Sequence, residues 1–282
     1  MVIDRNKLYD VIILPTISTR EIIMHKDIAR QLANILSVIF ALTINILANV
    51  LPLNGQNTGE ISDRFHVFFV PAGYVFAIWG VIYIGWIAFV IYQAQPAHRE
   101  SPRLRNLGYL FAISCIFNAA WLFCWHYNQF GLSVVVMFML LGLLIASYLK
   151  LNVGRTSVGV LEKWSVDIPF SLYLGWITVA AVANVTSYLD FIHWTGFGIV
   201  PQVWAVIMLG VASLLGLGMT VSRRDSGYAF VLVWSFAGIA IKQSVEPLVA
   251  NSAWVAALVA LGLAVYSLIQ RRRLSASSPI PS

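Results

Sequence analysis

The chain has 282 residues, of which 59% are hydrophobic and 11% are charged, and its mean hydropathy is +0.80. This composition excludes an ordinary water-soluble globular domain and indicates an integral membrane protein, for which lipid is the first expected partner. The formal net charge of +6 does not indicate nucleic-acid binding. The basic residues are spread over loops, where they set the orientation of the chain and contact anionic lipid head groups.

Eight apolar stretches follow one another along the chain, each near the roughly 20 residues that a helix needs to cross a membrane. They predict spans at residues 31–51, 72–93, 106–125, 131–150, 165–188, 201–221, 227–249 and 252–270. The stretches are too long for the strands of a barrel, and an open sheet edge cannot exist in lipid. We therefore expect an all-α fold, a polytopic membrane bundle of about eight transmembrane helices.

Positively charged residues alternate with the spans. Lys and Arg cluster before residue 31, at 99–105, at 150–163, at 223–224 and at 271–273. Cytoplasmic loops retain such residues and translocated loops are poor in them, so both termini are predicted to be cytoplasmic. The cytoplasmic N-terminal segment, residues 1–30, lacks the order of features that marks a cleaved signal peptide. An uncleaved, positive-inside chain fits a bacterial-type inner membrane.

The seventh span, residues 227–249, is included because two cytoplasmic termini require an even number of crossings. Its clean apolar run has the length of a re-entrant segment, but seven crossings would place the last basic cluster outside. Lys242 and Glu246 follow this run at helical i,i+4 spacing. We expect both side chains near the outer interface, where Lys242 extends toward water and is partly paired with Glu246.

Amide and indole side chains inside the spans are the main chemical signal, because no metal-ligand spacing, nucleophile elbow or nucleotide-binding loop is present. Counted from the outer span ends at about 1.5 Å per residue, they fall in one leaflet, with Trp176 nearer the midplane. The others are Asn45, Asn49, Trp79, Asn118, Trp121 and Asn184. The linker 52–70 is the longest outer connection, and we predict that it covers an outward-facing pocket as a lid.

Each of these side chains also has a purely structural interpretation. A buried Asn commonly joins two membrane helices by a hydrogen bond, and a Trp inside a span packs in the core. His66 and His126 are candidate ligands for haem iron, but both are expected at the outer surface as solvated side chains. The sequence alone leaves these alternatives open.

Three short motifs lie in order on the second, third and fifth spans. They read Pro71-Ala-Gly-Tyr-Val-Phe76-Ala-Ile-Trp79-Gly-Val-Ile-Tyr83, then Asn118-Ala-Ala-Trp121-Leu-Phe, then Tyr173-Leu-Gly-Trp176 continuing to Ala180 and Asn184. At these residues the sequence resembles the TspO/MBR family of tryptophan-rich sensory proteins, which are related to the mitochondrial translocator protein. The resemblance covers residues 31–190, the first five spans.

This resemblance implies a TspO-like five-helix core, residues 31–190, that binds tetrapyrroles such as haem and porphyrins and, in some relatives, sterols. Residues 191–270 then form a three-helix extension without a counterpart in five-helix members, and residues 271–282 form a cytoplasmic tail. Indole and phenol rings can stack on a porphyrin, while amides and a cation such as Arg64 can hold its propionates. The implied ligand-binding residues are Asn49, Phe76, Trp79, Tyr83, Asn118, Trp121, Trp176 and Asn184.

The sequence also departs from the family pattern. Pro71-Ala72 stands in place of a double Pro, and Leu172 replaces the Pro that precedes the Tyr of the fifth helix. The Trp-Tyr that usually ends the first helix is absent, and Asn49-Val-Leu-Pro stands there instead. These differences leave the expected fold unchanged and bear mainly on which ligand is bound.

Two functions from different classes follow. The first is a membrane sensor or regulator that binds tetrapyrrole-like or other hydrophobic small molecules in a pocket between the first, second, third and fifth spans. The second is a secondary transporter that uses Lys242 and Glu246, which the even number of spans supports. No enzyme, catalytic residue, metal site or cofactor is expected, because no nucleophile–base pair is recognisable. The sequence leaves open whether two chains form a homodimer.

Overall fold

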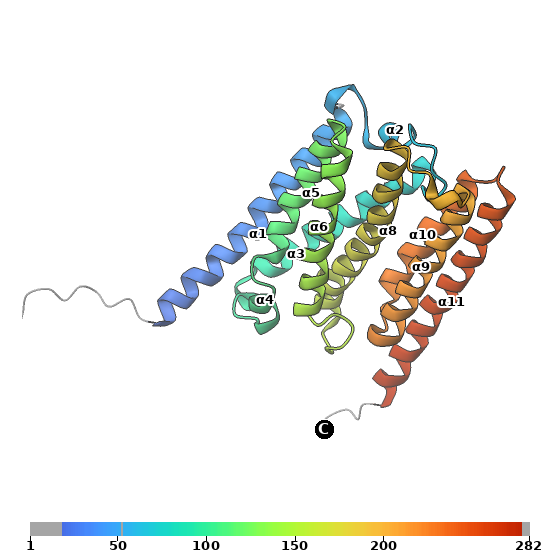
Figure 1. The fold of residues 1–282 in the computed structure, drawn as a ribbon. Coiled ribbons are helices and arrows are strands. Elements are labelled where there is room, and N and C mark those ends of the chain that lie inside the picture. Colours follow the sequence, from blue (N-terminus) through green and yellow to red (C-terminus); the bar gives the residue numbers. More distant parts are fainter. Residues whose placement is uncertain (1–18, 52, 278–282) are drawn as a thin grey trace, which may run out of the picture.

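The computed structural model describes residues 19–51 and 53–277, with side chains from residue 24 to residue 270 within these ranges. Much of the expected N-terminal segment 1–30 and of the expected tail 271–282 therefore lies outside the described residues. The described part is helical and contains no strands. Figure 1 shows the helices side by side in one bundle.

Eight apolar helices run between the two ends of this bundle. They are α1 (Thr19–Val50), α3 (Ile78–Ala94), α5 (Leu110–His126), α6 (Phe130–Lys150), α8 (Ile168–Phe191), α9 (Pro201–Arg223), α10 (Ser226–Lys242) and α11 (Pro247–Ser277). Each corresponds to one predicted span. Six form segments of 18 residues or more that are apolar enough to cross a membrane, while α5 and α10 are shorter, with 17 residues each. The prediction of an all-α polytopic membrane bundle is confirmed.

Short helical elements join and extend the long helices. They are η2 (Leu53–Gly55), α2 (Thr58–Ser62), η3 (Gly73–Ala77), η4 (Pro96–His98), α4 (Pro102–Leu107), α7 (Val160–Glu162), η5 (Lys163–Asp167) and η6 (Gly196–Gly198). The first three belong to the connection between α1 and α3. Because η3 leads directly into α3 and η5 leads directly into α8, these elements lengthen the two apolar helices that follow them.

Local sequence signals explain where several helices begin and end. Pro201 and Pro247 are the first residues of α9 and α11, a position where proline loses no hydrogen bond. Arg224 ends α9 in a left-handed conformation with φ of 51°. Directly afterwards, the Asp225 side chain caps α10 by accepting a hydrogen bond from the backbone N–H of Tyr228 at 3.1 Å.

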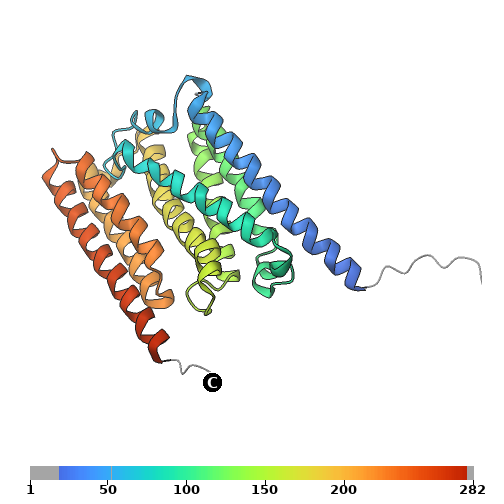
Figure 2. The same cartoon turned by 180° about the vertical axis from the view of Figure 1, so that it is seen from behind.

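The long helices form two groups. In the first group, α1 packs on α3 and α5, α6 packs on α5 and α8, and α3 also contacts α8. Figure 2 shows α3 running obliquely across the bundle between α1 and α8. In the second group, α9, α10 and α11 contact one another, and α10 packs on α8. The helix α8 therefore lies at the boundary between the two groups.

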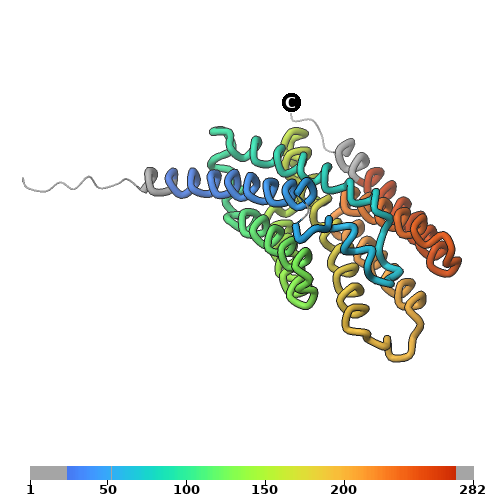
Figure 3. Tube along the Cα trace, turned by 90° about the horizontal axis from the view of Figure 1, so that it is seen from above, coloured from blue at the N-terminus to red at the C-terminus, as the bar shows by residue number. Residues whose placement is uncertain are grey.

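The described part of the linker, residues 53–70, crosses one end of the bundle. Seen from above in Figure 3, it runs from the end of α1 across the bundle toward the last helices. Its helix α2 contacts α5, and the following η3 contacts α10. Figure 1 places this linker at the end of the bundle opposite to the start of α1 and the end of α11.

A block of aromatic side chains fills the middle of the first helix group. Phe89 lies 4.8 Å from Phe111 and 5.2 Å from Phe170 between ring centroids, and Trp86 lies 5.0 Å from Tyr173. Such edge-to-face pairs contribute about 0.5–1.5 kcal/mol each beyond the burial of their area. All five side chains are buried, so this block closes the bundle between its two ends.

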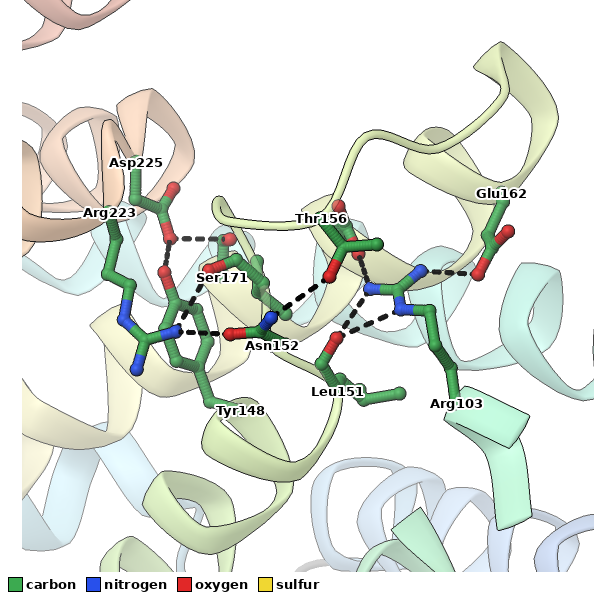
Figure 4. Close-up of polar contacts among 11 residues, drawn as sticks. Arg103, Tyr148, Leu151, Asn152, Thr156, Glu162, Ser171, Arg223 and Asp225 are labelled. Carbon is green, nitrogen blue, oxygen red and sulfur yellow. Dashed lines mark hydrogen bonds and ion pairs between the residues drawn. The ribbon is translucent and has the colours of Figure 1, made fainter. Parts of the chain in front are cut away.

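The end of the bundle away from the linker is held by ion pairs between partly buried and buried charges (Figure 4). Arg103 of α4 forms ion pairs with Glu162 and, at 2.6 Å, with Asp167, and it donates two hydrogen bonds to the carbonyl oxygen of Leu151. Burial alone lowers the pKa of Arg103, but the hydrogen bonds and charges of the two carboxylates outweigh it and raise the pKa overall. The guanidinium is therefore charged at every physiological pH.

A second buried carboxylate joins the two helix groups at the same end (Figure 4). Asp225, which is 2% exposed, accepts hydrogen bonds from the Tyr148 hydroxyl at 2.7 Å and from the Ser171 hydroxyl at 2.6 Å. Nearby, Arg223 donates to the Asn152 side chain at 3.2 Å. These contacts fasten the turn between α9 and α10 to α6 and α8.

Candidate functional site

A cavity of about 430 Å³ lies at the linker end, between α1, α3 and α5. We call it the first cavity. It is lined by Asn45, Asn49, Asn57, Thr58, Gly59, Glu60, Asp63, Gly73, Phe76, Trp79, Tyr83, Trp121 and Leu122. Five of the eight residues that the sequence suggested for ligand binding are among these. The linker contributes its α2 segment to the wall.

Three side chains from three helices share one hydrogen-bond network beside the first cavity. The Asn45 amide of α1 donates to Asn118 Oδ1 of α5 at 2.8 Å, and Asn45 Oδ1 accepts from the Tyr83 hydroxyl of α3 at 2.8 Å. Asn118 is 1% exposed and does not line the cavity. It therefore has the structural role of joining helices, and it acts on the cavity by orienting Asn45.

Aromatic rings form a continuous wall on the α3 side of the first cavity. Trp79 stacks on Tyr83 with ring centroids 5.6 Å apart and an interplanar angle of 26°. Trp79 also lies edge-on to Tyr173 and Trp176 of α8, each at 6.2 Å between ring centroids, and Trp176 in turn contacts Phe76 at 5.7 Å. The rings of this wall thus pack against one another and also line the cavity.

A smaller cavity, of about 40 Å³, lies beyond this wall toward α8. Trp176 and Asn184 line the smaller cavity but not the first one, whereas Phe76 and Trp121 line both. The indole N–H of Trp121 donates to Asn184 Oδ1 at 2.8 Å, and the Asn184 amide donates to the Ser133 hydroxyl at 2.9 Å. The Trp176 indole nitrogen is buried without a hydrogen-bond partner. Phe76 and Trp121 therefore stand between the two cavities. Together the two cavities are lined by all of the residues that the sequence suggested for ligand binding except Asn118.

The linker is fastened to the end of α5 through His126. The His126 ring nitrogens lie 3.1 Å from the Thr58 hydroxyl and 3.1 Å from the Leu53 carbonyl oxygen, and its own carbonyl oxygen accepts from the Asn54 amide at 2.9 Å. The expectation of a solvated His126 is wrong, because the linker folds over this ring and leaves it 0% exposed. The other candidate, His66, is exposed as expected.

An ion pair connects the linker to the second helix group. Lys242 Nζ lies 2.6 Å from the Asp63 carboxylate. The expected pairing of Lys242 with Glu246 is wrong, because α10 ends at Lys242 and the two residues do not share a helix. Glu246 Oε2 instead accepts a hydrogen bond from Gln202 at 3.4 Å.

Helix α10 also supports η3, the segment that carries Phe76. The backbone N–H of Ala72 donates to the Gly238 carbonyl oxygen at 3.1 Å, and the Trp234 indole donates to the Val75 carbonyl oxygen at 2.9 Å. A Cβ at Gly238 would lie 2.2 Å from Val75 Cγ2, so this close approach requires glycine. The isolated glycine in an apolar helix was the signal for such a contact, but its partner was not recognisable from the sequence.

The charges at the first cavity are carboxylates. Glu60 and Asp63 line it and no Lys or Arg does. Arg64, the suggested partner for propionates, instead donates to Asn128 at 2.6 Å and lies over the Phe130 ring. No cluster of His, Cys, Asp or Glu suited to a metal occurs among the described residues. Asp63 is paired with Lys242, so Glu60 is the carboxylate of the lining that disfavours anions. The site can stack aromatic groups and offer amide hydrogen bonds.

The fold and this site define a polytopic α-helical membrane protein with a cavity of aromatic and amide side chains beneath the linker between α1 and α3. The family model described as TSPO-like protein matches residues 31–266. The chain therefore belongs to the TSPO-like family, whose members are membrane proteins of the sensor or binding type and are generally not enzymes. A comparison with curated proteins and one with solved structures found no match.

The family match includes six of the long helices completely, together with most of α1 and most of α11. It thus continues past residue 190, where the motifs of the sequence end. This extent agrees with the contacts of the last three helices, because α10 packs on α8 and η3, which build the site, and α9 and α11 pack on α10.

Proposed function

We propose that the protein is a membrane sensor that binds a tetrapyrrole, or another hydrophobic molecule with a planar aromatic body, in the first cavity. One observation carries the proposal: Phe76, Trp79, Tyr83 and Trp121 line a single space of about 430 Å³ with the amides of α1. Pockets for small molecules are mostly apolar, measure roughly 300–1,000 Å³ and hold a few orienting polar groups. The first cavity fits this description.

The polarity of the mouth sets the orientation of the ligand. Its aromatic body stacks on the wall of Trp79 and Tyr83, and the Asn49 amide supplies a hydrogen bond. Carboxylate substituents of a porphyrin point away from Glu60, toward solvent, because like charges repel, whereas the charge of Asp63 is already compensated by Lys242. Neutral planar ligands meet no such restriction.

Occupancy reaches the rest of the bundle through Trp121. A ligand larger than the first cavity displaces Trp121 and Phe76 into the smaller cavity, and this breaks the hydrogen bond from Trp121 to Asn184 of α8. Helix α8 packs on α10, which holds the linker through Lys242. The break therefore alters both groups of helices.

The proposal includes a topology in which both termini are cytoplasmic, in a bacterial-type inner membrane. Figure 1 supports an even number of crossings, since α1 begins and α11 ends at the same end of the bundle. Basic residues in and beside the connections between the long helices, such as Arg99, Arg103 and Lys150, lie at that end, as expected for a cytoplasmic face. The division into a core, residues 31–190, and an extension, residues 191–270, belongs to the same proposal.

The test is a titration of purified protein with protoporphyrin IX, followed by the absorbance of the porphyrin so that removing a Trp does not change the signal. Trp121→Ala is expected to weaken binding about tenfold or more, as the loss of one stacking partner does. Asn118→Ala weakens it less, through Asn45. Trp164→Ala removes an indole that is 63% exposed and serves as the matched control. Equal affinities for the Trp121 and Trp164 variants would contradict the proposal.

The transport alternative has lost part of its support, because Lys242 and Glu246 do not form a pair among the described residues. It predicts that substrate flux into sealed vesicles depends on these two side chains. The sensor proposal predicts instead that Lys242→Ala leaves porphyrin affinity within about twofold, since the exposed ion pair contributes little. Measuring both quantities on the same variant separates the two functions.

A further inference from the structure

A second cavity lies at the linker end, on the other side of α8. It measures about 310 Å³ and is enclosed by the last turn of α8, η6, the start of α9 and residues 66–69 of the linker. We call it the side cavity. It shares no lining residue with the first cavity or the smaller one. The side cavity depends on α9, which belongs to the second helix group.

The aromatic wall of the side cavity is fixed by hydrogen bonds. Trp194 and Trp204 lie 5.3 Å apart between ring centroids, and the Trp204 indole donates to the Gly196 carbonyl oxygen at 3.0 Å. Gly196 has φ of +65°, and a Cβ there would lie 3.1 Å from the Trp204 indole nitrogen. The backbone at residue 196 therefore lies so close to the Trp204 indole that glycine is required there.

The end of α8 positions Trp194 in this wall. The Trp194 N–H donates to the Leu189 carbonyl oxygen at 3.0 Å, and the His193 N–H donates to the Asp190 carbonyl oxygen at 2.9 Å. With His193 left-handed at φ of 53°, this is the Schellman ending of a helix, which brings Trp194 back against Leu189. Both of these side chains line the side cavity.

One carboxylate faces this space without a cation. Asp190 lines the side cavity, and its Oδ2 accepts a hydrogen bond from the backbone N–H of His66 at 3.1 Å. Among the described residues no basic side chain forms an ion pair with it. Asp190 also lies in the last turn of α8, where the carbonyl ends of the helix already carry partial negative charge. The local field therefore favours a positive charge beside Asp190.

We infer that the side cavity binds an organic ammonium ion. A carboxylate supplies the ion pair, and the faces of Trp194 and Trp204 attract the cation by their quadrupoles and cover its apolar part. The volume suits a small amine rather than a large planar ligand. The same chemistry belongs to a free amine and to the ammonium head group of a lipid such as phosphatidylethanolamine, and these are the two sources to distinguish.

Equilibrium dialysis of the full chain in detergent with radiolabelled benzyltrimethylammonium tests the inference. Saturable binding to one site is expected, and neopentylbenzene, the uncharged analogue of equal shape, should not compete. Asp190→Asn, which keeps an acceptor for the His66 N–H, should weaken binding about tenfold or more, and Trp204→Leu should weaken it similarly. Glu100→Gln removes a charge from an exposed residue elsewhere and should leave the affinity unchanged.

The outcomes are separable. Absence of saturable binding, equal affinity for wild type and Asp190→Asn, or competition by neopentylbenzene would each overturn the inference. Size-exclusion profiles and thermal unfolding of every variant show that a loss of binding is not a loss of fold. Repeating the dialysis in nanodiscs of phosphatidylglycerol, with and without phosphatidylethanolamine, identifies the source: weaker probe binding in the mixed discs assigns the site to the lipid head group, and unchanged binding assigns it to a free amine.

Discussion

The two ends of the helical bundle are built from different polar groups. At the linker end, amides and indoles border open spaces, and the one ion pair there, Lys242 with Asp63, is partly exposed. At the opposite end, the partly buried Arg103 and the buried Asp225 are each surrounded by hydrogen-bonding partners (Figure 4). One end is suited to admit a ligand, and the other to hold the helices in place.

Physical chemistry explains why these roles are separated. Buried charges hold a site rigidly, because breaking one contact leaves an uncompensated charge. Neutral amides and indoles can exchange partners at a cost of only about 0.6–1.7 kcal/mol per hydrogen bond between membrane helices. A binding cavity therefore benefits from amides, and the aromatic block around Phe89 and Phe111 separates it from the rigid end.

The largest expected effect is at the rigid end. Arg103→Ala removes the partly buried cation that pairs with Glu162 and Asp167, and we expect the free energy of unfolding to fall by about 3 kcal/mol, the lower end of the range for a broken buried ion pair. Thermal or denaturant unfolding in detergent measures the change. Arg155→Ala removes an exposed arginine from the neighbouring loop and should change stability by less than about 0.5 kcal/mol. If both variants unfold alike, the ion pairs of Arg103 do not hold the end of the bundle away from the linker.

A smaller effect is expected where α10 meets η3. Gly238→Ala forces a Cβ to within 2.2 Å of Val75 Cγ2, and such overpacking costs about 1–3 kcal/mol. Gly262→Ala in α11, where nothing lies within 4 Å, is the control and should be neutral or slightly stabilising. Because η3 carries Phe76, the Gly238 variant should also weaken binding in the first cavity. Lost stability with unchanged binding would show that α10 does not support the site.

The amide network should give a still smaller effect. A double-mutant cycle with Asn45→Ala and Asn118→Ala isolates the hydrogen bond of 2.8 Å between them. We expect a coupling energy of about 0.6–1.7 kcal/mol, as for other hydrogen bonds between membrane helices. Unfolding of the two single variants and the double variant supplies the measurement. Additive effects would mean that Asn118 does not orient Asn45.

The sequence was sufficient to predict the fold because membrane spans depend on local composition. A run of about 20 apolar residues has few alternatives in lipid, and eight such runs became eight helices. Depth counting also placed Asn45, Trp79 and Trp121 at one level, and all three line the first cavity. Each of these predictions needed only the position of a residue along its own helix.

What the sequence did not predict depends on the path of the linker and on helix ends. His126 is buried because the linker folds over it, and Lys242 pairs with Asp63 because α10 ends at that lysine. Trp194 and Trp204 lie at span ends, where interfacial aromatic residues are common, but they form the wall of a cavity because the turn after α8 folds back. Contacts between residues 179 positions apart, such as Lys242 with Asp63, leave no mark in local patterns.

The smallest expected effect concerns that ion pair, and it tests how firmly the linker is closed. The Lys242 and Asp63 side chains are 28% and 60% exposed, so Lys242→Ala should cost less than about 1 kcal/mol. The pair is screened by salt, so the difference from wild type should shrink as sodium chloride is raised toward about 1 M. Lys150→Ala, an exposed lysine at the opposite end, controls for the change in net charge. If Lys242→Ala lowers the free energy of unfolding by several kcal/mol, the linker end is held as rigidly as the end with Arg103. The contacts of His126 and α10 with the linker would then depend on this one ion pair.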